Sequence, residues 1–282
     1  SGLEFPMTLA KTEITKPGDL TLPSSDAEIK KLIENDKGNY KYTVEDYFKK
    51  PKSSSFQLSP NGKYLSYKEK DDKGKNHVYV KETTTGKVTR AIEEKEELIR
   101  GYGWINDERL LYVMDKGGDE NYHVYAVNLD GSNLKDLTPF DGVKASILNS
   151  LKEQKDYIIV SMNKDNKQIQ EPYKVNVVTG TMEKLYTNND PANPIMGYEF
   201  DKDGHLKAFV KMKNGVNSEL YYKGTGDTDF KLLKTTKWDE TFAIISFNYA
   251  TPNPDDAYVL TNLDSDKSRI VLYDFKTGKT VK

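Results

Sequence analysis

Short runs of alternating apolar and polar residues, separated by turn residues, fill the chain from about residue 54 onward. Phe56 and Leu58 alternate with polar neighbours, which predicts a strand with one buried face. The Ser-Pro-Asn-Gly sequence at 59–62 predicts a tight turn, because proline presets φ and Asn-Gly tolerates positive φ. Three further predicted strands follow at 63–68, 77–80 and 88–92. Together these four strands predict an antiparallel meander.

The same meander recurs four more times along the chain. A glycine in the turn before each fourth strand marks the repeat: Gly86, Gly131, Gly180, Gly226 and Gly278. The intervals between these glycines are 45, 49, 46 and 52 residues, and four short strands in such a period are typical of a β-propeller blade. We therefore predict an all-β fold, a β-propeller of five four-stranded antiparallel blades. The blades are expected at approximately 54–92, 99–138, 143–187, 194–235 and 242–282.

The N-terminal 40 residues differ from the rest and predict an arm with a short helix, ahead of a propeller over 41–282. Residues 1–22 are polar and contain Pro6 and Pro17, so they predict an extended arm. A capping-box sequence, Ser25 to Glu28, precedes apolar residues that share one helical face. These signals predict a helix over 26–36.

Composition narrows the classes of partner and location. The net charge of −2 is spread along the 282 residues, so we expect no nucleic-acid partner. The chain has no cysteine and no run of 18 apolar residues, which predicts no disulfide and no membrane span. No signal peptide is present, but the Ser1-Gly2 start is typical of an expression scar. We expect a periplasmic or secreted protein whose leader was removed, with a cytoplasmic location as the alternative.

The first blade resembles a known type of propeller. Its sequence Leu58-Ser-Pro-Asn-Gly-Lys-Tyr-Leu65 is similar to the blades of TolB-like proteins and of the prolyl oligopeptidase family of serine peptidases. The segment Val44–Phe48 resembles the one preceding the first blade in acylaminoacyl-peptidase-like and dipeptidyl-aminopeptidase-like members. The run 136–145 resembles a blade junction of that branch, and Thr179-Gly180 after the strand at 173–177 matches its blade pattern.

This resemblance implies a parent enzyme in which an N-terminal propeller gates access to a C-terminal α/β-hydrolase domain. That domain would carry a Gly-x-Ser-x-Gly nucleophile turn, and this chain has no such sequence. No catalytic residue can be assigned, so we expect the chain to be an inactive fragment that selects peptide substrates. Its expected partners are the hydrolase domain of the same polypeptide, peptide substrates, and further copies through the parent.

Other arrangements and functions stay open at this stage. A strand at Lys11–Thr15 could instead complete a closed five-bladed ring. The chain could be a TolB-like propeller that binds proteins without catalysis. It could also be a five-bladed glycosidase, whose carboxylates would converge from different blades.

The candidate substrate-binding residues are Glu96 and Glu97, in an acidic run between the first two blades. Dipeptidyl members of the resembled family hold the substrate's amino terminus with an acidic pair, and paired carboxylates bind an ammonium group well. The alternative is a solvated loop between blades.

We expect no metal and no cofactor. His77, His123 and His205 lie at repeat positions in the blades, which indicates a structural role. The sequences at 201–204 and 264–266 predict hairpin turns, since neither has the acidic residue that completes a calcium loop. Trp104 and Trp238 are expected to pack between blades.

Overall fold

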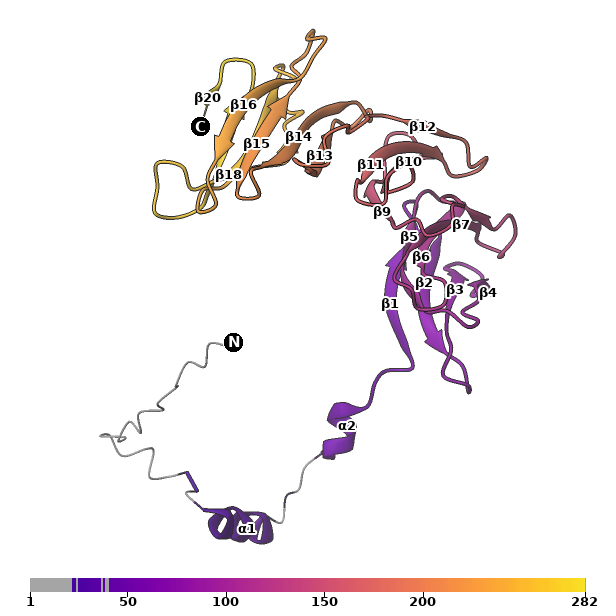
Figure 1. The fold of residues 1–282 in the computed structure, drawn as a ribbon. Coiled ribbons are helices and arrows are strands. Elements are labelled where there is room, and N and C mark those ends of the chain that lie inside the picture. The colour runs from indigo at the N-terminus through magenta and orange to yellow at the C-terminus, as the bar shows by residue number, and fades with distance from the viewer. Residues whose placement is uncertain (1–21, 24, 37, 39–40, 282) are drawn as a thin grey trace, which may run out of the picture. The chain divides into compact units, whose positions relative to one another are not determined.

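The computed structural model describes residues 22–23, 25–36, 38 and 41–281 (Figure 1). The chain divides into two compact units, Ser1–Pro51 and Lys52–Lys282. The predicted arm, apart from residue 22, and the strand proposed at 11–15 lie outside the described residues.

The first unit contains two helices among its described residues. Helix α1 spans Asp26–Asn35, close to the predicted range, and Ser25 caps it by accepting a hydrogen bond from the Glu28 backbone N–H at 3.3 Å. Helix α2 spans Val44–Phe48 and was not predicted from the sequence. Its N-terminus is a capping box, in which the Thr43 and Asp46 side chains each accept from the other residue's backbone N–H. This spacing of Thr and an acidic residue was the missed helix signal.

The second unit consists of five four-stranded antiparallel sheets in chain order, which confirms the predicted five blades. The first holds β1 (Ser53–Leu58), β2 (Tyr64–Lys70), β3 (Asn76–Glu82) and β4 (Val88–Ile92). The second holds β5 (Ile99–Trp104), β6 (Arg109–Met114), β7 (His123–Asn128) and β8 (Lys135–Asp136). The third holds β9 (Ala145–Asn149), β10 (Tyr157–Met162), β11 (Glu171–Asn176) and β12 (Met182–Lys184). The fourth holds β13 (Ile195–Phe200), β14 (Leu206–Lys213), β15 (Asn217–Tyr222) and β16 (Lys231–Thr236). The fifth holds β17 (Phe242–Phe247), β18 (Asp256–Thr261), β19 (Arg269–Asp274) and β20 (Lys279–Thr280).

The turn glycines that marked the repeat share one backbone conformation. All five have a φ between 71° and 87°, in the left-handed region that a Cβ disfavours. In the first hairpin, Gly62 also has a positive φ and its N–H donates to the Ser59 carbonyl at 2.9 Å. The sequence pattern therefore located turns whose geometry requires glycine.

The hydrophobic core is divided among the junctions between successive blades. Val78 and Val80 of the first blade are buried with Leu110 and Val127 of the second in one cluster. Three more clusters join blades two and three, three and four, and four and five. Burying one such side chain contributes about 1.5–3 kcal/mol. Because these buried side chains lie at the junctions, each blade is stabilised mainly by packing against its neighbours.

In each of the first four blades, a hydrogen bond links the turn after the first strand to the next blade. The recurring bonds join Asn61 N–H to Asp107 Oδ1 at 2.9 Å, Asn106 Nδ2 to the Lys155 carbonyl at 2.8 Å, Gln154 Nε2 to the Asp203 carbonyl, and Lys202 N–H to Tyr249 Oη at 2.7 Å. The described blades are thus joined along one series of turns as well as through their cores.

Candidate functional site

The first strand of every blade departs from regular pairing with the second strand. Such β-bulges redirect side chains, and here they leave large residues exposed on strands that would otherwise alternate. The large exposed side chains at these irregularities are Phe56, Arg100, Leu148, Met196 and Ile245. The apolar ones are 38% to 61% exposed, so the first strands present a repeated series of unburied apolar groups.

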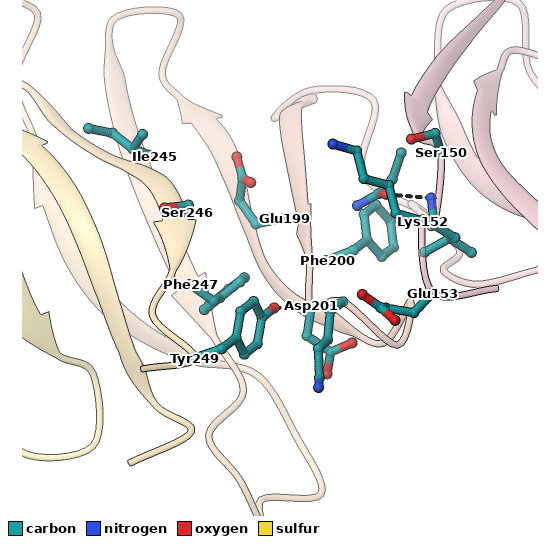
Figure 2. A pocket seen from close by; sticks show the side chains of 13 residues that line it. Ser150, Lys152, Glu153, Glu199, Phe200, Asp201, Ile245, Ser246, Phe247 and Tyr249 are labelled. Atoms are coloured by element: carbon teal, nitrogen blue, oxygen red, sulfur yellow. Dashed lines mark hydrogen bonds between the residues drawn. The ribbon is translucent and has the colours of Figure 1, made fainter. Parts of the chain in front are cut away.

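A cavity of about 430 Å³ opens beside three of these first strands (Figure 2). Its wall is formed by the loop after β9, by the end of β13 with the following turn, and by β17 with Tyr249. Phe200 and Phe247 are both 8% exposed and contribute apolar surface to the wall. This volume is within the range of small-ligand sites.

The loop after β9 is held in place by its own backbone and by the core. The Asn149 side chain accepts a hydrogen bond from the Leu151 backbone N–H at 2.8 Å. Leu151 has a φ of 42°, which is strained for a leucine, and its side chain is buried in the core between blades three and four. This anchoring fixes the backbone from which Lys152 and Glu153 reach the cavity.

Glu199 is the chemically distinctive residue of this cavity. It lies on β13 opposite Ala208, and its side chain lines the cavity together with those of Ser150 and Ser246 (Figure 2). Among the described residues, no hydrogen bond or ion pair engages its carboxylate. Burial raises the pKa of Glu199 from 4.5 to about 7, because the charged form loses hydration without gaining a partner.

A second cavity, of about 400 Å³, follows the same pair of strands, β9 and β13. Ser146 and Leu148 line it from one strand, and Met196 and Tyr198 from the other. The Oε1 atom of Gln170 is buried in this region without a hydrogen-bond partner. The two cavities thus place apolar side chains near the half-buried Glu199 carboxylate in one case and near the unpartnered Gln170 Oε1 in the other.

The predicted site residues Glu96 and Glu97 lie in the loop between β4 and β5, and neither lines the cavities just described. Glu97 accepts a hydrogen bond from the Gly117 backbone N–H at 2.6 Å, whereas Glu96 is exposed. Glu94 of the same run is only 4% exposed and accepts the N–H groups of Asn76 and Ile99, each at 3.0 Å. One member of the run is therefore structural, and the role of Glu96 and Glu97 stays a prediction.

Each histidine is hydrogen-bonded to an aspartate of its own blade: His77 to Asp71, His123 to Asp136 and His205 to Asp201. Ligand atoms of Asp201, Asp203 and His205 also lie within 4.8 Å of one another. The hairpin turn accounts for this grouping, since Asp201 accepts the backbone N–H groups of the other two.

The two tryptophans differ. Trp104 donates from Nε1 to the Ser66 hydroxyl of the preceding blade at 2.9 Å, as expected for packing between blades. Trp238 lies just after β16 and is 80% exposed, so the expectation that it packs between blades was wrong.

Comparisons with known proteins address the family. No protein-family model matches the chain. The chain is 35% identical over 179 residues to dipeptidyl aminopeptidase BIII of Pseudoxanthomonas mexicana, which covers 63% of this chain and 25% of that protein. The resemblance to the peptidase propellers is confirmed. The chain is also 24% identical over 236 residues to dipeptidyl peptidase family member 6 of Caenorhabditis elegans. This match covers 80% of this chain and 30% of that protein.

A solved prolyl endopeptidase structure matches with a TM-score of 0.55 at 13% identity, over 79% of this chain and 34% of that one. At this identity the match supports the fold alone. The chain spans only about a quarter to a third of the peptidases it resembles. Among the described residues, no helix is both long and apolar enough to cross a bilayer.

Sequence reasoning located β13 but overlooked Glu199. The available signal was a glutamate within an otherwise apolar and aromatic strand, Ile195–Phe200, immediately before a turn. That signal alone does not reveal the cavity, which also needs β9 and β17.

Proposed function

We propose that the second unit is the peptide-selecting propeller of a serine peptidase of the prolyl oligopeptidase family. The observation that carries this proposal is the 35% identity to dipeptidyl aminopeptidase BIII over 179 residues. The two cavities beside the first strands support it, because apolar side chains near polar groups without protein partners suit the side chains of a bound peptide.

In this proposal an α/β-hydrolase domain of the same polypeptide carries the catalytic serine, and the propeller limits which peptides reach it. Glu96 and Glu97 would hold the substrate's amino terminus, since carboxylates pair well with an ammonium group. Association of further copies would occur through the complete enzyme. A periplasmic or secreted location completes the proposal.

The first test uses the isolated 282-residue chain. We expect no hydrolysis of aminoacyl or dipeptidyl chromogenic substrates. Turnover that a serine-directed reagent abolishes would contradict the assignment of catalysis to another domain.

The second test uses the full-length gene product. Glu96→Gln and Glu97→Gln should raise KM for dipeptidyl substrates with a free amino terminus and leave kcat nearly unchanged. Glu183→Gln is the matched control, because Glu183 is also exposed but lies on β12, away from the run. A full-length protein without peptidase activity would refute the proposed function.

A further inference from the structure

Glu199 is half-buried and lines a cavity, and among the described residues its carboxylate has no hydrogen-bond or ion-pair partner. Desolvating a carboxylate is unfavourable unless a hydrogen-bond donor or a cation compensates it. A positively charged or donating group at this point would offset the hydration that the half-buried Glu199 carboxylate has partly lost. Glu199 lines this cavity together with residues of the third and fifth blades (Figure 2).

The residues around Glu199 also indicate the shape and polarity of a suitable ligand. Ile245 is exposed on the neighbouring first strand, and Phe247 and Tyr249 extend the apolar and aromatic wall. Apolar walls favour a ligand whose charge is carried on a hydrocarbon stem. The Tyr249 ring is held in place, since its hydroxyl accepts the Lys202 backbone N–H at 2.7 Å.

We propose that this cavity binds the basic side chain of a peptide, an ammonium or guanidinium group on an apolar stem, with Glu199 as its counterion. The stem would lie against Ile245 and Phe247, and the cation would approach Glu199. The site is separate from Glu96 and Glu97, so it would select a residue within the peptide. The claim that the ligand is a peptide rests on the proposed function.

Other charged groups line the same cavity and must be considered. Lys152 and Glu153 come from the loop after β9, and Asp201 and Lys202 come from the turn after β13. Asp201 is engaged by its own turn, and the Lys202 ammonium lies 5.6 Å from the Tyr249 ring centre. No ion pair joins Lys152 to Glu199 within the described part of the chain. Lys152 is the group that would compete with a cationic ligand.

The test measures binding of small peptide probes by calorimetry, without any catalytic step. The first probe is N-acetylated, C-amidated Ala-Arg-Ala, and the second replaces its arginine with norleucine. We expect the arginine probe to bind at least about tenfold more tightly than the norleucine probe, because only arginine forms charge-assisted hydrogen bonds. Glu199→Gln should remove that preference, and the exposed control Glu183→Gln should retain it.

Two further measurements separate this site from simple charge attraction. Binding of the arginine probe to the unmodified protein should weaken about five- to tenfold from pH 8 to pH 6, as Glu199 becomes protonated. The Glu199→Gln protein should lack this pH dependence. Lys152→Ala should strengthen binding, because it removes the competing cation.

A third probe, Ala-norleucine-Ala-amide with a free amino terminus, distinguishes the source of the cation. Loss of its binding in Glu199→Gln, with no preference for arginine, would assign the site to the peptide's amino terminus and overturn the proposal. Equal binding of the arginine probe to Glu199→Gln and Glu183→Gln would also overturn it. Because no hydrolysis is measured, either result leaves the proposed peptidase function to its own tests.

Discussion

The backbone N–H of Asn61 donates to Oδ1 of Asp107 at 2.9 Å, across the junction of the first and second blades. Asn61 belongs to the hairpin turn from which the repeat was first recognised, and Asp107 occupies the equivalent turn of the next blade. The turn residues thus have two roles, since they reverse the chain and also contact the neighbouring blade.

Replacing Asp107 tests the second role. Asp107→Ala should lower the free energy of unfolding by about 1 kcal/mol, because it leaves the Asn61 N–H without its acceptor. Glu108→Ala is the control, since Glu108 lies next in the same turn and its side chain is exposed. Urea denaturation followed by tryptophan fluorescence measures both. Equal midpoints for the two variants would show that the bond between turns does not contribute.

Asp255 links the fifth blade to the fourth through several hydrogen bonds. It is 1% exposed and accepts from Tyr222 Oη at 2.7 Å, from the Thr225 N–H at 2.9 Å and from Lys207 Nζ at 3.2 Å. Asp255→Ala should destabilise the protein by about 3 kcal/mol, because it leaves a buried ammonium group unpaired. Tyr222→Phe removes one hydrogen bond only and should cost about 1 kcal/mol. A smaller effect of Asp255→Ala than of Tyr222→Phe would contradict this ranking.

The carboxylate of Asp255 should also make the free energy of unfolding depend on pH. Burial alone would raise the pKa of Asp255, but the hydrogen bonds from Tyr222, Thr225 and Lys207 outweigh it and leave the pKa below its usual value. A carboxylate whose pKa is depressed in the folded state stabilises that state at pH values above its unfolded-state pKa. This contribution is lost as the pH falls through the folded-state pKa. The difference in unfolding free energy between the unmodified protein and Asp255→Ala should therefore shrink below about pH 4. A difference that is constant from pH 3 to pH 7 would exclude this linkage.

The repeat was predictable because its signals are local. Alternation within each strand and the left-handed turn at Gly86 and its four counterparts depend on neighbouring residues only. Helix α1 was found for the same reason, through Ser25 and the apolar face that follows it. Blade number and strand order then followed from counting the repeat.

The candidate site was not predictable in the same way. Glu199 is distinctive because β9, β13 and β17, which are about 50 residues apart along the chain, meet around it. Whether its carboxylate has a partner depends on side chains from all three strands. Trp238 shows the converse, since its size suggested burial while its position after β16 leaves it exposed.

The acidic run between the first two blades can be divided by mutation into structural and exposed members. Glu94→Ala should lower the free energy of unfolding by about 1–3 kcal/mol, because the Asn76 and Ile99 N–H groups lose a charged acceptor. Glu96→Ala should change it by less than about 0.5 kcal/mol, since that side chain is exposed. Chemical denaturation of both variants checks the contrast. If Glu96→Ala destabilised the protein as much as Glu94→Ala, any effect of Glu96 on peptide binding could not be separated from folding.

Glu199 should lower the free energy of unfolding at neutral pH, whereas Asp255 should raise it. Its folded-state pKa of about 7 lies above the ordinary value of 4.5, so the unfolded state ionises first as the pH rises. The folded state should lose stability between about pH 4.5 and pH 7, and Glu199→Gln should remove that loss. At pH 8 the variant should be more stable by on the order of 2 kcal/mol, and at pH 4 the two proteins should be alike. Denaturation midpoints of Glu199→Gln and the control Glu183→Gln, measured from pH 4 to pH 8, provide the comparison. A Glu199→Gln curve parallel to the unmodified protein at every pH would show that the carboxylate is compensated in solution, and a cationic ligand would then no longer be needed to offset its burial.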